Sequence, residues 1–412
     1  MLKAQQFLEL YCNNQSLDES LYLLVKNICD DVKVNGDAAL KKYNLTFDHV
    51  DTTSLEISKQ DIQKAYDELN KDTLNALHQS YERIKSYQEK IKYSSTKKGE
   101  CYEVYHPIER VGIYVPGGKA SYPSTVLMTA TLAQVANVEE IVVVTPPKTN
   151  GVSKEVLAAC HLTGVNHVYQ VGGAQSIAAL TYGTETIKPV DKIVGPGNQY
   201  VALAKKYVYG DVGIDQIAGP TELAMIIDET AQIDAITYDI FAQAEHDEMA
   251  RTFVISDNAQ ILQQLQLNID NKLKTIDRHS IVSKSIANHH YLIEVSDMEE
   301  ACHILNKIAP EHASIQTKHP EQFIDQIKFV GALFIGHYAP EAIGDYIAGP
   351  SHVLPTNQTA RFSNGLSVND FMTRHSVINL SKSTFKKVAY SAERLACVES
   401  LNNHQQSIHI RH

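Results

Sequence analysis

The stretch that decides the fold is residues 140–171, EIVVVTPPKTNGVSKEVLAACHLTGVNHVYQV. Two short runs rich in β-branched residues, 140–145 and 167–171, stand at its ends. Between them, near 153–163, apolar residues recur at helical spacing. A strand, a helix and a second strand in this order are typical of a βαβ unit, in which both strands lie parallel in one sheet.

The same alternation continues on both sides of this unit. A first series has expected strands at 110–115, 140–145, 167–171 and 191–194, and helices near 124–137, 153–163, 174–182 and 199–207. A second series has strands at 223–228, 251–256, 291–295, 313–316 and 332–335, and helices near 231–247, 258–268, 297–308 and 320–328. The sequence therefore predicts an α/β protein with two Rossmann-like parallel sheets.

The two ends of the chain are expected to be helical. Capping boxes begin at Ser16 and Ser58, and a long amphipathic helix is expected to follow the second one. A final helix is expected near 383–401. We therefore expect a helical N-terminal arm (1–105) for packing or dimerisation, α/β domains at 106–228 and 229–370, and a helical C-terminal tail (371–412).

Composition narrows the possible functions. The 412 residues exceed the roughly 250–300 that one hydrophobic core supports, so two or more structural units are expected. The net charge of −11 disfavours binding to nucleic acid or to an anionic membrane surface. No apolar run approaches the roughly 20 residues of a membrane span, and the N-terminus lacks a signal-peptide pattern. Six cysteines without a C-x-x-C pair fit a cytoplasmic protein with reduced thiols.

Three glycine-rich turns follow successive strands of the first series. They lie at 114–118, 171–175 and 194–198, and the last is not a dinucleotide fingerprint because Tyr200 occupies the third glycine position. A single turn of this kind is usually only a tight turn. Three at the carboxyl ends of neighbouring parallel strands would line the crevice where such sheets bind nucleotides.

Polar pairs in the second series suggest further chemistry. Gln243 and His246 lie three residues apart and share a helix face, which suits a divalent metal or simply a polar helix end. Glu311 and His312 join a helix to a strand, and a carboxylate beside an imidazole suits acid–base chemistry, although such neighbours are common. Residues 344–356 read as a rigid loop or an ordinary turn, with Asp345 and His352 seven residues apart.

Taken together and in this order, these segments resemble the histidinol dehydrogenase family. The resemblance covers the chain from about 110 to its end, in the stretches 114–118, 172–180, 195–205, 218–222, 243–247, 310–312, 344–356, 365–371 and 399–404. It implies oxidation of L-histidinol to L-histidine, in histidine biosynthesis, by two NAD in succession with one zinc ion per subunit. It also implies a sheet architecture similar to that of aldehyde dehydrogenases.

The resemblance carries roles onto individual residues. It implies that the zinc ligands are Gln243, His246, Asp345 and His404, and that the acid–base pair is Glu311 and His312. The implied substrate contacts are Thr221, Gln243, His246, His312, Asp345, Glu399 and His404. The implied NAD contacts are Tyr114, Gln175 and Asn198. Thr221 departs from the serine common in the family but keeps the hydroxyl, so a small effect is expected.

Two other readings of the sequence stay open at this stage. A zinc hydrolase or deaminase could use Glu311 and a metal to activate water, but the three glycine-rich turns argue against it. A binding protein that lost its activity would show losses among the ligand positions, and none is seen. The resemblance further implies a homodimer with shared active sites, in which Glu399 and His404 of the tail act on the neighbouring chain.

Overall fold

The computed structural model describes residues 1–11, 19–117 and 121–412, and it divides them into two units. The body comprises Met1–Ile91 and Ile108–Phe371, and the tail unit comprises Lys92–Pro107 and Met372–His412. Each unit is described by itself. The predicted capping box at Ser16 and the end of the first glycine-rich turn, Gly118, lie outside the described residues.

The first sheet of the body is parallel throughout and has the order β5-β4-β3-β6-β7. Its strands are β3 (Arg110–Tyr114), β4 (Glu140–Thr145), β5 (His167–Gln170), β6 (Lys192–Val194) and β7 (Gly213–Ile214). The helices α5 (Pro123–Ala136), α6 (Lys154–Leu162), α7 (Gly173–Tyr182) and α8 (Gln199–Val208) connect and follow them. The first predicted series of strands and helices is thus confirmed.

The N-terminal helices pack on this sheet's helical layers and do not form a separate arm. They are α2 (Glu19–Phe47), which contacts α7 and α8, α3 (Lys59–Asp67), which contacts α6, and α4 (Lys71–Ile91), which contacts α5. Burial of an apolar stripe explains the packing, since Val25, Ile28 and Val32 lie in the core with Ile177. The expected arm boundary at 105 therefore does not describe this part of the fold.

The predicted long helix after Ser58 is broken in two. Its start is as expected, because Ser58 Oγ accepts a hydrogen bond of 3.1 Å from the Asp61 amide. The helix α3 ends at Asp67, and Asn70 Oδ1 then accepts a hydrogen bond of 2.8 Å from the Thr73 amide. A side-chain cap of this kind begins a new helix, which the apolar periodicity alone did not reveal.

The second sheet of the body is also parallel, with the order β1-β10-β9-β8-β11-β12. Its strands are β1 (Leu2–Lys3), β8 (Glu222–Ile227), β9 (Arg251–Ser256), β10 (His290–Glu294), β11 (His312–Gln316) and β12 (Ala332–Ile335). The expected domain boundary at 228 falls after β8, whereas β8 is an inner strand of this sheet. The second sheet therefore includes the chain from residue 222, seven residues before the expected start at 229, in addition to β1 near the N-terminus.

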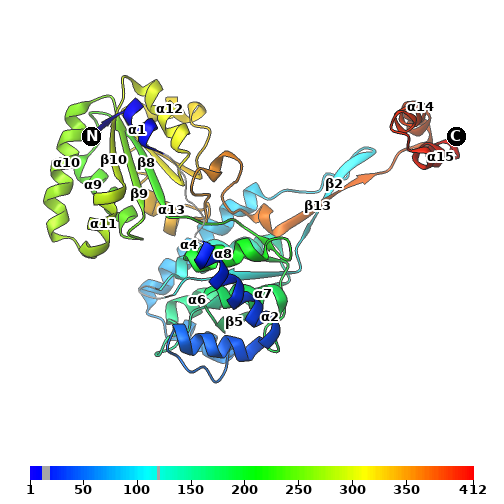
Figure 1. Cartoon of the computed structure of the whole chain (residues 1–412), viewed down its shortest axis with the longest axis horizontal. Coiled ribbons are helices and arrows are strands. Elements are labelled where there is room, and N and C mark those ends of the chain that lie inside the picture. Colours follow the sequence, from blue (N-terminus) through cyan, green and yellow to red (C-terminus); the bar gives the residue numbers. More distant parts are fainter. Residues whose placement is uncertain (12–18, 118–120) are drawn as a thin grey trace. The chain divides into compact units, whose positions relative to one another are not determined.

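Helices cover both faces of the second sheet (Figure 1). They are α1 (Ala4–Leu10) and α12 (Met298–Ile308) on one face, and α9 (Ile233–Ala244), α10 (Ala259–Lys272) and α11 (His279–His289) on the other. The helix expected at 320–328 is a 3₁₀ helix, Pro320–Gln326. The predicted loop 344–356 begins inside a short helix, α13 (Glu341–Tyr346), so Asp345 lies on a helix.

The tail unit is a two-stranded ribbon followed by two helices (Figure 1). The strands β2 (Cys101–Pro107) and β13 (Met372–Ile378) pair antiparallel, and α14 (Lys382–Val398) packs against α15 (Asn402–His409). The expected helical tail is confirmed by α14 and α15, and the tail also contains the strand β13, which satisfies its backbone groups by pairing with β2. Several apolar side chains of this unit are exposed: Ile378, Tyr390, Leu395, Val398 and Ile410.

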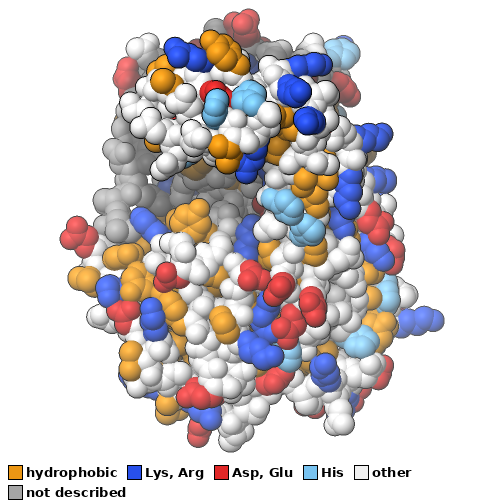
Figure 2. All heavy atoms as spheres, turned by 90° about the vertical axis from the view of Figure 1, so that its right-hand side faces the viewer, with side chains coloured by type: hydrophobic (Ala, Val, Ile, Leu, Met, Phe, Trp, Pro, Cys, Tyr) orange, Lys and Arg blue, Asp and Glu red, His pale blue; other side chains and the backbone are white. Residues whose placement is uncertain are grey.

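Basic and acidic side chains are interspersed on the face drawn in Figure 2. Among the described residues, no helix is both long and apolar enough to cross a membrane.

Candidate active site

The acid–base candidates lie at the amino-terminal edge of the second sheet. His312 begins β11 and pairs in register with Leu223 of the neighbouring β8. Gln243 lies in the last turn of α9, which returns from the carboxyl end of β8 to the same edge. Open α/β sheets usually bind ligands at their carboxyl edge. The catalytic candidates of this chain therefore meet at the opposite edge of their sheet.

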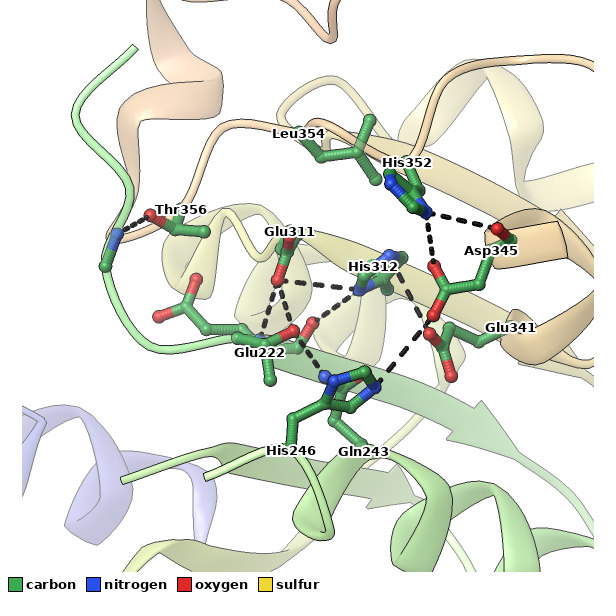
Figure 3. Close-up of polar contacts among 12 residues, drawn as sticks. Glu222, Gln243, His246, Glu311, His312, Glu341, Asp345, His352, Leu354 and Thr356 are labelled. Carbon is green, nitrogen blue, oxygen red and sulfur yellow. Dashed lines mark hydrogen bonds and ion pairs between the residues drawn. The ribbon is translucent and has the colours of Figure 1, made fainter. Parts of the chain in front are cut away.

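Glu311 is buried and held by two donors (Figure 3). Its Oε2 accepts hydrogen bonds from the Thr221 hydroxyl at 2.5 Å and from the Glu222 amide at 3.1 Å. Burial raises the pKa of Glu311 to about 8, although both donors act in the opposite direction. The carboxyl group is therefore protonated at neutral pH and ionises in mildly alkaline solution.

His312 has its two ring nitrogens in different environments. Its Nδ1 lies 3.2 Å from the Glu222 carbonyl oxygen, which can only accept a hydrogen bond. Nδ1 therefore carries the proton, and Nε2 keeps the lone pair. Burial lowers the pKa of His312 to about 4, so the ring is neutral at physiological pH and Nε2 carries an unprotonated lone pair.

Three of the expected metal ligands converge beside this pair (Figure 3). His246 Nε2 lies 3.9 Å from Asp345 Oδ2. The Gln243 amide nitrogen donates to the Thr221 hydroxyl, while its buried Oε1 has no hydrogen-bond partner among the described residues. A buried amide oxygen without a donor requires a partner such as a cation. The Gln243 side-chain oxygen, together with the His246 imidazole and the Asp345 carboxylate, forms a set of ligand atoms that fits a divalent metal such as Zn²⁺.

Glu341 also belongs to this cluster and was not among the expected site residues. Its side chain is buried, and Oε1 lies 3.9 Å from His312 Nε2. Oxygen or nitrogen atoms of His312, Glu341 and Asp345 all lie within 4.8 Å of one another, a spacing that can hold a metal ion. Burial, and then the charge of Asp345, raise the pKa of Glu341 to about 9. The spacing of Glu341 and Asp345 places them on one face of α13, a signal that the loop interpretation concealed.

A cavity of about 470 Å³ opens against His312, Asp345 and His352. His352 Nδ1 lies 3.1 Å from the Asp345 carbonyl oxygen and 3.9 Å from its Oδ1. Its Nε2 is buried and, in the part of the chain described, makes no hydrogen bond. The side chain thus offers a second ring nitrogen beside the cavity, and the fold places His352 against Asp345, seven residues earlier in the chain.

The expected NAD contacts lie at the carboxyl edge of the first sheet. Tyr114 ends β3, and its hydroxyl accepts a hydrogen bond of 3.4 Å from the Gly173 amide. Gln175 is in the first turn of α7, and both side chains are buried. Asn198 is exposed and caps α8, with Oδ1 accepting from two amides of its first turn. The three glycine-rich turns follow the parallel strands β3, β5 and β6 of one sheet. Only β3 and β6 are neighbours, because β4 lies between β5 and β3, so the expectation of three neighbouring strands is confirmed in part.

Glu399 and His404 both belong to the tail unit and are exposed. Glu399 is the C-cap of α14, and His404 lies in α15. Their contribution to the cluster in the body stays a prediction.

A profile of the histidinol dehydrogenase family matches residues 13–412. The chain belongs to this family. Histidinol dehydrogenases of Staphylococcus epidermidis and Staphylococcus aureus are 69% and 68% identical to it, with complete coverage of both chains in each comparison. The crystal structure of histidinol dehydrogenase from Elizabethkingia anophelis is 32% identical, covers 97% of this chain and 93% of its own, and superposes with a TM-score of 0.92.

A more distant likeness concerns the fold alone. An acetylating aldehyde dehydrogenase from Geobacillus thermoglucosidasius is 13% identical, with a TM-score of 0.50 over 90% of this chain and 99% of its own. As a member of the histidinol dehydrogenase family the chain is an oxidoreductase, and the expected likeness to aldehyde dehydrogenase architecture is confirmed.

Thr221, the departure from the family's usual serine, has a clear place in this site. Its hydroxyl accepts from the Gln243 amide and donates to Glu311, so it joins the metal side of the cluster to the acid–base pair. A serine hydroxyl can make both hydrogen bonds. This geometry agrees with the expectation that the change has a small effect.

Proposed function

We propose that this chain oxidises L-histidinol to L-histidine in two NAD-dependent steps through histidinaldehyde, with Glu311 and His312 as its acid–base pair. The observation that carries the proposal is the buried, neutral His312, whose Nδ1 is held by a backbone carbonyl while Nε2 is free to accept a proton. A base of this kind suits the oxidation of an alcohol, in which a hydroxyl proton leaves together with a hydride.

In the first step His312 Nε2 accepts the hydroxyl proton of the substrate. The imidazole is fixed by the Glu222 carbonyl and by burial, so its basic nitrogen keeps one direction without reorganisation. The aldehyde formed would stay bound beside His312 until the second oxidation. His312 then serves as the base for the second oxidation as well.

In the second step Glu311 activates water to form the aldehyde hydrate. The carboxylate form is required, and Thr221 and the Glu222 amide stabilise it from one side. Because the pKa of Glu311 is raised to about 8, this step should be faster in mildly alkaline solution. Water is the proposed nucleophile because the five described cysteines, all free, lie outside the cluster.

The residues that would hold the metal are Gln243, His246 and Asp345 from the body, with His404 of a tail unit as the fourth ligand. A bound zinc ion would fix the amine and imidazole nitrogens of histidinol, and NAD would accept the hydride. Thr221, His312 and Glu399 complete the proposed substrate contacts. Tyr114, Gln175 and Asn198 are the proposed NAD contacts.

The tail unit supports a proposal about assembly. Its exposed apolar residues, such as Leu395 and Val398, need a covering surface. We propose a homodimer in which the tail of one chain completes the site of the other, since exchange of identical elements readily forms closed dimers. A cytoplasmic location is proposed from the free thiols.

The test is turnover with defined substrates. Zinc-loaded protein is mixed with NAD and L-histidinol, and NADH absorbance and histidine are both measured. Two NADH per histidine are expected. An amino alcohol without the imidazole should give no NADH, and His312→Asn is the matched inactive control. NADH formation without histidine, or no NADH from well-folded zinc-loaded protein, would contradict the proposal.

A further inference from the structure

A buried ion pair lies behind the turn between β6 and α8, at the first sheet. Lys205 of α8 and Asp215, which follows β7, each keep only 3% of the side chain exposed, and Nζ lies 2.7 Å from Oδ1. Desolvation offsets most of the attraction in such a pair, and apolar residues of similar size are often equally stabilising. Stability alone is therefore a weak reason for these two charges.

The pair holds both peptide groups of a single glycine. Lys205 Nζ donates to the Gly195 carbonyl oxygen at 2.5 Å, and Asp215 Oδ2 accepts from the Gly195 amide at 2.8 Å. Gly195 has φ of +110°, where side chains are strained, and an added Cβ would lie 2.2 Å from the Tyr114 carbonyl oxygen. The two side chains thus fix the backbone of this turn against the end of β3.

The turn held in this way leads to an expected NAD contact. Residues 195–198 run from Gly195 to Asn198, whose side chain caps α8 and whose surface is exposed. Asp215 Oδ1, the oxygen that receives the Lys205 ammonium, also accepts a hydrogen bond of 2.6 Å from the Gln216 amide, so both carboxylate oxygens are held by partners within the fold. The ion pair is buried on the inner side of the turn. The exposed residue of the turn, Asn198, therefore stays accessible to a ligand.

We propose that Lys205 and Asp215 are positioning residues that hold the 195–198 turn in the conformation that receives NAD. This inference rests on the proposed function, because it takes that turn as part of the coenzyme site. The two charges neutralise each other, so the pair acts through hydrogen bonds to Gly195 and not through attraction of the anionic coenzyme. Loss of the pair should consequently weaken NAD binding without disturbing the metal and histidinol site.

The decisive variant replaces both charges together, Lys205→Met with Asp215→Leu. It leaves no unpaired buried charge, so the fold should be retained, but it removes both hydrogen bonds to Gly195. Lys206→Met is the control for the lysine substitution, because Lys206 is the exposed neighbour on α8 and its replacement leaves the buried pair intact. The affinity for NADH is measured by fluorescence titration without substrate, and histidinol affinity by calorimetry on zinc-loaded protein.

The double variant should raise the Kd for NADH and the KM for NAD by about tenfold or more. Its kcat at saturating NAD, its histidinol Kd and its melting temperature should stay close to the wild-type values. Lys206→Met should bind NADH like the wild type. If the double variant does not fold, Asp215→Glu, which keeps the charge but displaces the carboxylate, takes its place with the same expectation.

Wild-type affinity for NADH in the double variant would overturn the inference, as would an equal loss in Lys206→Met. An equal loss of histidinol binding would also overturn it, because the effect would then be general. A wild-type protein that binds no NADH would instead contradict the proposed function, so the two failures can be told apart.

Discussion

Individual residues of this site differ in protonation because they differ in burial and in hydrogen-bonding partners. Glu311 and His312 are adjacent in the chain and both buried, yet burial raises the pKa of the carboxyl group and lowers that of the imidazole. Burial disfavours the charged form of each group, which is the shared cause. The result is a neutral carboxylic acid beside a neutral imidazole. In the proposed reaction, His312 accepts a proton in both oxidations, whereas Glu311 activates water only in the second.

The first prediction separates the roles of His312 and Glu311. His312→Asn should slow oxidation of both histidinol and histidinaldehyde by roughly 10²–10⁴-fold, because one base serves both hydride transfers. Glu311→Gln should slow mainly the aldehyde step, since only that step requires activated water. Glutamine still accepts from Thr221, so the site keeps its shape. Each substrate is supplied separately and NADH formation is timed. Equal slowing of both steps by Glu311→Gln would show that the roles are not divided.

The second prediction concerns pH and stability in metal-free protein. Glu311 has a pKa of about 8 when folded and roughly 4.3 when unfolded, so its protonated form favours the folded state. That stabilisation is complete below the unfolded value and is lost as pH rises through about 8. The wild type should therefore melt at lower temperature at pH 9 than at pH 6. Glu311→Gln should reduce this difference by about 2 °C or more in calorimetric scans. An unchanged difference would mean that the carboxyl group is not buried in its neutral form.

At the scale of elements, helices and strands bring site residues together that are far apart in the sequence. The parallel neighbours β8 and β11 place Thr221 beside Glu311, and α9 returns Gln243 to the same edge. The helix α13 supplies both Glu341 and Asp345. By contrast, α12 leads into the acid–base pair but contributes apolar packing, including the buried Cys302.

The third prediction tests that packing role. Cys302→Ala should leave aldehyde oxidation within a few-fold of the wild type, because burial raises the pKa of the thiol to about 11 and a neutral thiol is a poor nucleophile. The exposed Cys397→Ala serves as the matched control. Melting temperature should fall slightly in Cys302→Ala alone. Loss of aldehyde oxidation in a folded Cys302→Ala protein would replace water by the thiol as nucleophile.

At the scale of the whole molecule, the body and the tail unit have different kinds of surface. The body buries separate apolar cores around two sheets, so we expect that its stability does not depend on one ion. The tail unit exposes apolar helix positions, which in a stable protein are usually covered by another surface.

The fourth prediction follows from the body's cores. Removal of metal by a chelator should abolish turnover while the far-ultraviolet circular dichroism stays within a few per cent of the untreated signal. Added Zn²⁺ should restore activity, and Mg²⁺, which prefers oxygen ligands, should not. A global loss of helical signal would assign the metal a structural role.

The fifth prediction tests whether sites are shared between chains. Homodimers of His404→Ala and of His312→Ala should each be nearly inactive. After refolding together, mixed dimers should regain up to one working site of two, because one intact tail meets one intact body. His312→Ala chains refolded on their own are the negative control, because every chain then has an intact tail but the same defect in the body. Heterodimers that form but stay inactive would place the tail on its own chain.

The sequence by itself determined most of the element order around both sheets, the cap at Ser58 and the residue types of the candidate site, although β1, β7 and α11 were not predicted. These features depend on hydrophobic periodicity and on residues a few positions apart, both of which can be recognised in the amino-acid sequence. Tertiary structure alone decided that the N-terminal helices join the body, that β2 pairs with β13, and that Glu341 lies beside His312. It also decided the protonation of Glu311 and His312. The reason is that burial and hydrogen bonds between residues some ninety positions apart arise from the register of parallel strands, which no local pattern records.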